Sequence, residues 1–309
     1  MVFVDGVGIG SNDPDVNPFT RARLDTFAQL LDSSTALTGA VPHASGSATL
    51  VPLDATLGIA GLPQSGTGQT SLLTGINAAR LFGRHFGPWV PTALRERLAH
   101  ENLLSLAKRA GRTVAFANAY PEELFSGDRA PPNRDRSKGP ISDPLRAGPP
   151  IAALGAEVLT RHTPELARGE AIASEITNEG WRKHLKRIEL PIVTAEEAGR
   201  NLGRIVAQND LTLFAHYATD SIGHTGHMWE AVEALQKIDE FLAGIVASVP
   251  DDTLTLVVSD HGNIEDIRAG HTVNPALALF VGREHQRCAA GVHSLTDVAP
   301  VLLSMLAQS

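Results

Sequence analysis

The stretch TLTLVVSDHGN, residues 253–263, decides the fold class of this chain. It is a short run of leucine, valine and threonine residues that ends at Asp260, followed by His261 and a glycine. A run of this length with apolar residues in succession is typical of a strand buried on both faces in a parallel sheet. Asp260 and His261 would then lie just beyond the carboxyl end of that strand, where ligands collect in open α/β sheets.

Other stretches repeat this design, with a short apolar run that ends near a polar residue. They are VFVD at the start, TVAFANAYP (113–121), LTLFAHYATD (211–220) and ALALFVG (276–282). Helical patterns lie between them, and the apolar residues of MWEAVEALQKIDEFLAGIVASV (228–249) trace one helical face. This alternation predicts an α/β fold with a mostly parallel sheet flanked by helices.

Residues 121–190 interrupt the alternation. The part from 127 to 150 contains six prolines and five basic residues, and a weakly amphipathic helical stretch follows it. We therefore predict a core formed by residues 1–120 and 191–309, with an inserted cap at 121–190. A chain of 309 residues is long enough to hold both.

Composition and charge exclude several classes of protein. The net charge of −8 provides no global basic field for nucleic acid or anionic lipid. A single cysteine, Cys288, excludes an internal disulfide framework and a cysteine-rich zinc site. The beginning, MVFVDGVGIG, lacks the features of a signal peptide, and no run approaches membrane-spanning length. We expect a cytoplasmic protein without nucleic-acid or membrane partners, in which local cations or a metal hold any anionic substrate.

Aspartate and histidine residues occur at several of the expected strand ends. Asp5 follows the first strand, Asp220 and His224 lie four residues apart in TDSIGHTGH, and His271 lies in GHTVNP. Singly, such residues are more often helix caps, turn residues or packed histidines. Together with Asp260 and His261 they form a cysteine-free oxygen and nitrogen ligand set suited to Zn²⁺ or Mn²⁺.

The stretch GLPQSGTGQTSLLTG, residues 61–75, is rich in glycine and hydroxyl side chains. As a phosphate-binding loop beginning at Gly61 it would need a lysine where Thr67 stands. As a dinucleotide fingerprint beginning at Gly66 it would need a glycine where Ser71 stands. A helix start with small residues, which lets a phosphate approach free backbone N–H groups, fits better.

Four blocks, DGVGIG, TDSIGHTGH, SDHGN and HTVNP, closely resemble in this order the metal-binding segments of cofactor-independent phosphoglycerate mutases and phosphopentomutases, in the alkaline phosphatase superfamily. The resemblance covers residues 1–120 and 191–309. It implies two divalent ions, Mn or Zn. One would be held by Asp220, His224 and His271, and the other by Asp5, Asp260, His261 and a nucleophilic hydroxyl.

Two alignments place the nucleophilic hydroxyl differently. Set without gaps against the mutase pattern, in which GLPE leads into GNSE, the GQTS of this chain makes Thr70 the nucleophile. Counted back from the TG at residues 74 and 75, as the phosphatases and sulfatases suggest, it is Ser65. Thr67 lies between them as a third candidate. We favour Thr70, because the other blocks match the mutases best.

The resemblance implies phosphoryl transfer through a covalent Thr or Ser intermediate on a small phosphorylated substrate. The sequence lacks the HSH.DH and arginine-rich segments of the phosphoglycerate mutases, and its insert is shorter than theirs. We therefore expect hydrolysis of a phosphate ester first and a phosphomutase next. A sulfatase, a metal-independent serine hydrolase and a non-catalytic metal-binding protein follow as weaker readings of the same residues. Candidate substrate contacts are Arg84, His85, Arg129, Arg134, Arg136 and Lys138.

Overall fold

A seven-stranded sheet crosses the middle of the molecule in the order β2-β3-β7-β6-β1-β5-β4. The computed structural model describes residues 1–35, 37–39, 41–125, 144–268 and 270–308. Strands β6, β1, β5 and β4 run parallel, whereas β7, β3 and β2 are added antiparallel at one side. The strands are β1 (Val2–Val4), β2 (His43–Ala44), β3 (Ala48–Leu53), β4 (Val114–Phe116), β5 (Leu211–His216), β6 (Leu254–Val258) and β7 (Ala276–Gly282).

The expected α/β architecture is confirmed, with a mixed sheet in place of a mostly parallel one. The difference arises from β7, which runs antiparallel to β6, and from β3, which pairs antiparallel with β7. The sequence patterns did not reveal β3 because Pro52 weakens its strand signal. Among the described residues, β2 pairs with Thr49 and Leu50 and does not reach Pro52, so β3 is an edge strand there and tolerates a proline.

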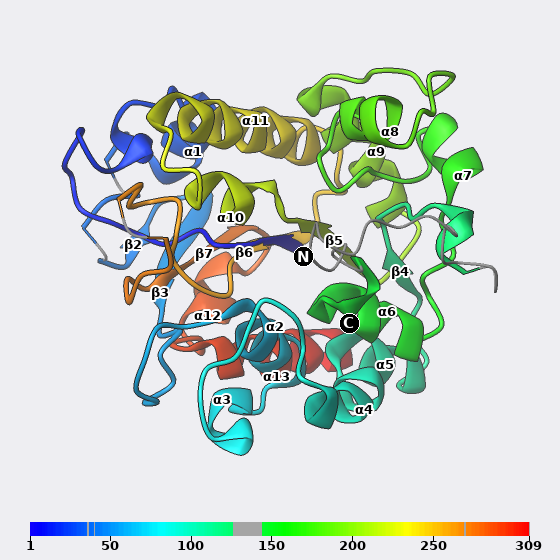
Figure 1. The fold of residues 1–309 in the computed structure, drawn as a ribbon, viewed down its shortest axis with the longest axis horizontal. Helices are drawn as coiled ribbons and strands as arrows, with labels where there is room; N and C mark the ends of the chain where they lie inside the picture. The colour runs from blue at the N-terminus through cyan, green and yellow to red at the C-terminus, as the bar shows by residue number, and fades with distance from the viewer. Residues whose placement is uncertain (36, 40, 126–143, 269, 309) are drawn as a thin grey trace, which may run out of the picture.

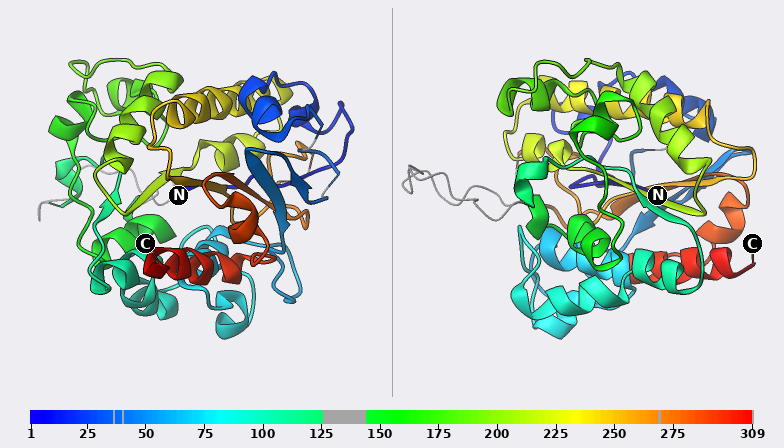
Figure 2. Two further views of the ribbon diagram at one scale, coloured as in Figure 1. Left: turned by 180° about the vertical axis from the view of Figure 1, so that it is seen from behind. Right: turned by 90° about the vertical axis from the view of Figure 1, so that its right-hand side faces the viewer.

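Helices cover both faces of the sheet (Figures 1 and 2). In the described residues, no helix is both long and apolar enough to cross a bilayer. One face carries α1 (Asp25–Leu31), α9 (Ala195–Val206) and α11 (Met228–Val246). The other carries α2 (Ser65–Thr74), α3 (Ala78–Phe82), α4 (Thr92–Glu101), α5 (Leu103–Arg109), α6 (Gly148–Gly155), α12 (His285–Ala289) and α13 (Leu295–Gln308).

Strand β1 shows why its residues are apolar in succession. Phe3 packs into the core on the side of α2 and α13, while Val2 and Val4 pack into the core on the side of α9 and α11. All three side chains are buried, and each contributes roughly 1.5–3 kcal/mol by leaving water. The central strand is thus held from both sides, which fixes the position of the loop that follows it.

The predicted insert divides between two packing environments in its described part. Helix α6 packs against α2, α4 and α5, and Ala152 and Ala153 belong to the same core as Phe3. Trp181 of α8 (Glu179–His184) joins a small separate cluster with Leu166 of α7 (Thr163–Ala167). The boundaries of the insert stay a prediction. Its basic residues Arg129, Arg134, Arg136 and Lys138 lie outside the described residues.

His216, at the end of β5, makes a prediction for acid stability. Its ring is buried and its Nδ1 donates to the carbonyl of Ser174 at 2.6 Å, and burial lowers its pKa to about 4. The unfolded chain, with an ordinary pKa near 6.5, binds the proton more readily, so stability falls as the pH drops below about 6.5.

When the pH falls from 7 to 5, protonation of His216 in the unfolded chain should lower the free energy of unfolding of the wild-type protein by about 2 kcal/mol. The His216→Gln variant, which can still donate to the carbonyl of Ser174, should lack this contribution. Urea unfolding of both proteins at the two pH values measures the difference. Equal losses in the two proteins would rule out His216 as the source.

Candidate metal centre

Three loops meet at one edge of the sheet because β1, β5 and β6 are parallel neighbours (Figure 1). Asp5 follows β1 directly, and Asp260 lies two residues after β6. Asp220 lies in the short helix α10 (Ala218–Gly223), just after β5. The sequence placed these aspartates at strand ends, and the structure brings their loops together.

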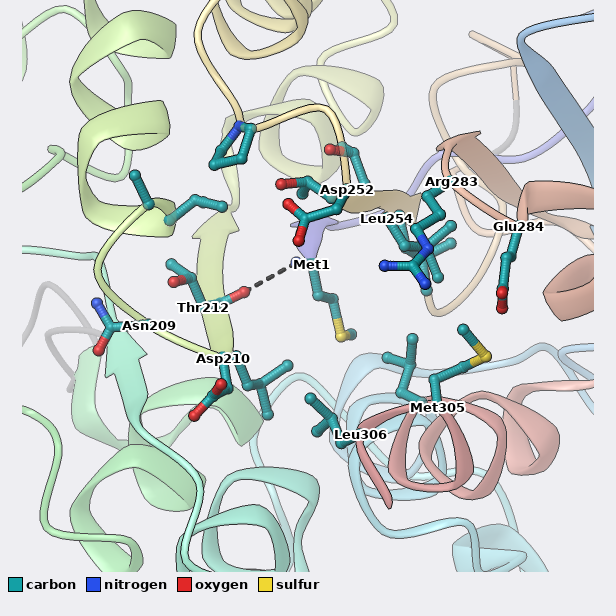
Figure 3. Close-up of a pocket in the computed structure, with 18 of the residues that line it drawn as sticks. Met1, Asn209, Asp210, Thr212, Asp252, Leu254, Arg283, Glu284, Met305 and Leu306 are labelled. Carbon is teal, nitrogen blue, oxygen red and sulfur yellow. Dashed lines mark hydrogen bonds between the residues drawn. The ribbon is translucent and has the colours of Figure 1, made fainter. Parts of the chain in front are cut away.

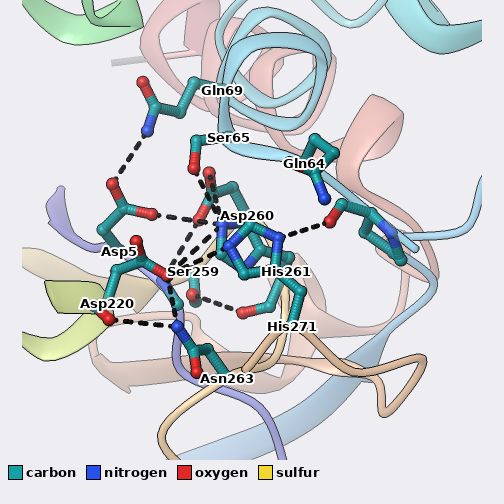
Figure 4. A network of polar contacts seen from close by, with 12 residues as sticks. Asp5, Gln64, Ser65, Gln69, Asp220, Ser259, Asp260, His261, Asn263 and His271 are labelled. Carbon is teal, nitrogen blue, oxygen red and sulfur yellow. Dashed lines mark hydrogen bonds and ion pairs between the residues drawn. The ribbon is translucent and has the colours of Figure 1, made fainter. Parts of the chain in front are cut away.

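Asp5, Asp260 and His261 form the first ligand group, with ligand atoms all within 4.8 Å of one another. The Nε2 atom of His261 lies 3.3 Å from Oδ1 of Asp5 and 3.7 Å from Oδ2 of Asp260 (Figure 4). All three residues are buried, and neither of these two carboxylate oxygens has a hydrogen-bond partner among the described residues. Buried, unpartnered carboxylate oxygens beside an imidazole fit a divalent cation.

Asp220, His224 and His271 form the second ligand group. The Nε2 atoms of His224 and His271 lie 3.5 Å and 3.4 Å from the carboxylate of Asp220. Nδ1 of His271 donates to the carbonyl of Pro63 at 2.8 Å, which leaves the lone pair of Nε2 free for a metal. This group is more open than the first, since the His224 side chain is 51% exposed.

The two ligand groups are adjacent. Nε2 of His261 lies 3.9 Å from Oδ1 of Asp220, and the rings of His261 and His271 stack with centroids 4.0 Å apart. Asn263 donates from Nδ2 to Oδ1 of Asp220 at 2.6 Å and so holds this carboxylate at the junction. The arrangement can therefore accommodate two ions side by side.

The charges of the site favour a positive charge between the carboxylates. Burial raises the pKa of Asp260 well above its usual range, and the charge of Asp5 raises it further. Burial also raises the pKa of Asp5. Burial alone would lower the pKa of His261, but the carboxylates of Asp260 and Asp5 outweigh it and raise the pKa to about 10. The protonated ring thus supplies the positive charge that a divalent ion would otherwise bring.

The three candidate hydroxyls in α2 have different partners. Oγ of Ser65, in the first residue of the helix, lies 3.0 Å from Nε2 of His261 (Figure 4). The hydroxyl of Thr70 donates to the carbonyl of Gly66 at 2.7 Å, within the same helix. The hydroxyl of Thr67 accepts from the backbone N–H of Phe86 at 3.1 Å. The structure brings Ser65, and neither threonine hydroxyl, to the first ligand group.

Gln69 contacts the first ligand group, and the sequence patterns did not reveal this contact. Its Nε2 donates to Oδ2 of Asp5 at 3.1 Å, and its Oε1 accepts from the backbone N–H of Gly148 at 2.8 Å. The available signal was its spacing. Gln69 is at position i+4 relative to Ser65, which places both side chains on one face of a helix. Asn263 was likewise missed, although it lies inside the SDHGN block.

Arg84 and His85 lie in a segment that packs on the first turn of α2, where the carbonyl of Phe86 accepts from the N–H of Thr67 at 3.0 Å. Nε2 of His85 contacts the carbonyl of Ile59 at 3.2 Å. Arg84 is exposed, with its guanidinium 5.7 Å from the centre of the Phe86 ring. Both residues therefore lie beside the helix start without a described contact to either ligand group.

A hollow of about 770 Å³ lies away from these ligands (Figure 3). Met1, Thr212 and Leu254 line it at the amino ends of β1, β5 and β6, together with Arg283 and Met305. None of the candidate ligands contributes to its lining, so in the described residues this hollow is separate from both ligand groups.

Comparison with known proteins agrees with this geometry. Residues 183–309 match the model of a family described as the Metalloenzyme superfamily. A 2,3-bisphosphoglycerate-independent phosphoglycerate mutase from Thiobacillus denitrificans is 35% identical over 108 residues, which are 32% of this chain and 21% of that protein. Its counterpart from Agrobacterium fabrum is 31% identical over 127 residues, or 38% and 25%. The matches thus span only about a fifth to a quarter of these relatives.

Solved structures share the fold over nearly the whole chain. The PH0037 protein from Pyrococcus horikoshii has a TM-score of 0.51 at 12% identity, covering 100% of this chain and 96% of that one. The alkaline phosphatase from the Antarctic bacterium TAB5 has a TM-score of 0.50 at 10% identity, covering 99% and 97%. Residues 183–309 are thus similar to the metalloenzyme superfamily, and the chain has an alkaline phosphatase-like fold with a distant resemblance to cofactor-independent phosphoglycerate mutase.

Proposed function

We propose that this protein is a two-metal phosphoryl-transfer enzyme that hydrolyses a small phosphate ester through a covalent intermediate on Ser65. The observation that carries the proposal is the position of Oγ of Ser65, 3.0 Å from Nε2 of His261 in the first ligand group. Ser65 thereby takes the place of Thr70 as the favoured nucleophile, because the Thr70 hydroxyl is engaged within its own helix.

The donor set suits two ions of the Mn or Zn type. Asp220, His224 and His271 would hold one, and Asp5, Asp260, His261 and the Ser65 hydroxyl would hold the other. When bound, such ions would neutralise the charge of the phosphoryl group and acidify the attacking hydroxyl. The buried carboxylates and the stacked imidazoles hold these donors in place before substrate arrives.

The proposed reaction has two steps at Ser65. Its oxygen attacks phosphorus after giving up its proton, and the ester oxygen leaves and takes a proton to become the alcohol product. Water then attacks the phosphoserine and releases inorganic phosphate, which restores the hydroxyl. The N-terminal end of α2, where Ser65 lies, directs its positive dipole end toward the transferred phosphoryl group.

A phosphomutase is the second candidate, supported by the sequence match to proteins named phosphoglycerate mutase. A mutase must retain its dephosphorylated product until the phosphoryl group returns to it. Part of the predicted insert belongs to the core, because α6 packs against α2, α4 and α5. We therefore place hydrolysis first and expect inorganic phosphate as the main product.

Metal analysis and a substrate screen test the proposal. We expect about two Mn or Zn ions per purified chain, and metal-dependent phosphate release from at least one class among phosphate monoesters, diesters and sugar phosphates. Sulfate esters in the same screen separate a phosphatase from a sulfatase, and product isomers separate a mutase. Absence of stoichiometric metal, with no turnover after reconstitution, would contradict an enzymatic role.

Arg84 is proposed as a substrate contact because it is exposed and its segment packs on the first turn of α2, which begins at Ser65. The Arg84→Ala variant should raise KM about tenfold with a smaller change in kcat, since a charge-assisted hydrogen bond to phosphate is worth roughly 1.5–3 kcal/mol. Steady-state kinetics measure this split. Arg80→Ala, at another exposed arginine of the same region, is the matched control. An equal effect of both changes would show that Arg84 has no specific contact.

A further inference from the structure

Glu265 is a buried carboxylate that belongs to neither ligand group, and only 1% of its surface is exposed. Its Oε2 accepts from the backbone N–H groups of Gly8 at 2.9 Å and Asn263 at 2.8 Å. Its Oε1 accepts from the hydroxyl of Thr272 at 2.5 Å and from Nδ2 of Asn274 at 3.0 Å. Two donors on each oxygen satisfy a carboxylate whose described contacts include no ion pair.

The donors come from the loops that carry the candidate ligands. Gly8 is three residues after Asp5, Asn263 is two residues after His261, and Thr272 directly follows His271. Asn263 also connects Glu265 to Asp220, because its side chain donates to the carboxylate of Asp220. One carboxylate therefore links the loops after β1 and β6 and the turn before β7, and it reaches the loop after β5 indirectly.

The backbone is shaped around this carboxylate. A Cβ atom on Gly8 would lie 2.5 Å from Oε1 of Glu265, and one on Gly262 would lie even closer to the same oxygen. Contacts this short exclude any side chain at either position unless Glu265 moves. Two of the ligand loops thus approach Glu265 as closely as a backbone can.

We propose that Glu265 is the positioning residue of the metal centre and sets the spacing between the two ligand groups; this rests on the proposed two-metal function. Oε2 fixes the loops of Asp5 and His261, which belong to the first group. Oε1 fixes the turn of His271, which belongs to the second. Glutamine has the same shape but presents an NH₂ group to two of the four donors, so it cannot hold both sets of loops at once.

The Glu265→Gln variant tests the proposal through metal binding. We expect its affinity for Mn²⁺, measured by calorimetry on the metal-free protein, to fall about 10- to 100-fold at both sites, the usual effect of losing a partner that orients metal ligands. The visible absorption bands of the Co²⁺-loaded protein should also shift, because they report ligand geometry. Asp266→Asn is the matched control: its carboxylate pairs with the exposed Arg268 at 2.7 Å, so the metal affinity and the spectrum of this variant should remain those of the wild type.

The Thr272→Val variant provides a milder test if Glu265→Gln does not fold. It removes one donor to Oε1 and leaves the hydrogen bonds of Oε2 unchanged. The affinity for the ion at Asp220, His224 and His271 should therefore fall more than the affinity for the other ion. Two Mn²⁺ sites in the wild type, with unchanged affinities and Co²⁺ spectra in every folded variant of the two, would overturn the role of Glu265. A wild type that binds no ion would instead refute the proposed function itself.

Discussion

Phosphate-ester turnover should fall at least about a thousandfold in the Ser65→Ala variant, the size of effect seen when a catalytic nucleophile is removed. The reason is geometric, because Ser65 is the α2 hydroxyl that lies within hydrogen-bond reach of His261. The loss should appear in kcat. With a slow substrate, rapid acid quenching of the wild type should trap a phosphorylated peptide that contains Ser65, and mass spectrometry would identify it.

Thr70→Val is the control for this prediction. The valine matches the shape of threonine and removes only the hydrogen bond to the carbonyl of Gly66, at a cost of about 1 kcal/mol in stability. Turnover should stay within a few-fold of the wild type. Loss of activity in Thr70→Val together with an active Ser65→Ala protein would favour the alignment to the mutases and refute Ser65.

Asp260→Asn should have opposite effects on stability with and without metal. In the metal-free protein, burial and the charge of Asp5 raise the pKa of Asp260, so its ionised form opposes folding at neutral pH. The sign follows from linkage: an acid whose folded pKa is raised loses stability as the pH rises above its unfolded value. Replacing it by a neutral amide should therefore raise the free energy of unfolding of the metal-free protein.

With Mn²⁺ present the order should reverse. An ion at a thousand times its dissociation constant stabilises the wild type by about 4 kcal/mol per site, and Asp260→Asn removes a ligand of the first group. Thermal unfolding of both proteins in chelator and in excess Mn²⁺ should therefore show the two melting temperatures exchanging rank. A variant that melts lower under both conditions would mean that Asp260 contributes to folding in another way.

The positions of the three candidate aspartates could be predicted from the sequence because each follows the end of a strand. Asp5, Asp220 and Asp260 follow short apolar runs, and parallel strands bring such ends to one edge. The structure gathers the six predicted residues into the two groups that the resemblance implied. Binding of metal by these groups stays a prediction.

The nucleophile could not be predicted in the same way. Ser65 and Thr70 are five residues apart on one helix, and in sequence both stand among glycines and hydroxyl residues. Which of them meets His261 depends on where the helix begins, and boundaries are poorly marked when, as here, the residue before the helix, Gln64, makes no side-chain capping bond. Strand β3 could not be predicted for a related reason. Pro52 weakens its strand pattern in the sequence, and the strand is stabilised by pairing with β7, which is distant in sequence.

The hydrogen bond from Gly148 to Gln69 has a consequence for protein engineering. Gly148 begins α6, inside the segment 121–190 that the sequence marks as an insert, while Gln69 holds Asp5. Replacing that whole segment by a short linker would leave the Gln69 carbonyl without this donor and open a hole where Ala152 and Ala153 fill the core. A minimal version of this protein would therefore have to keep α6. Loops grafted to change the substrate should replace parts of the segment 121–190 other than α6.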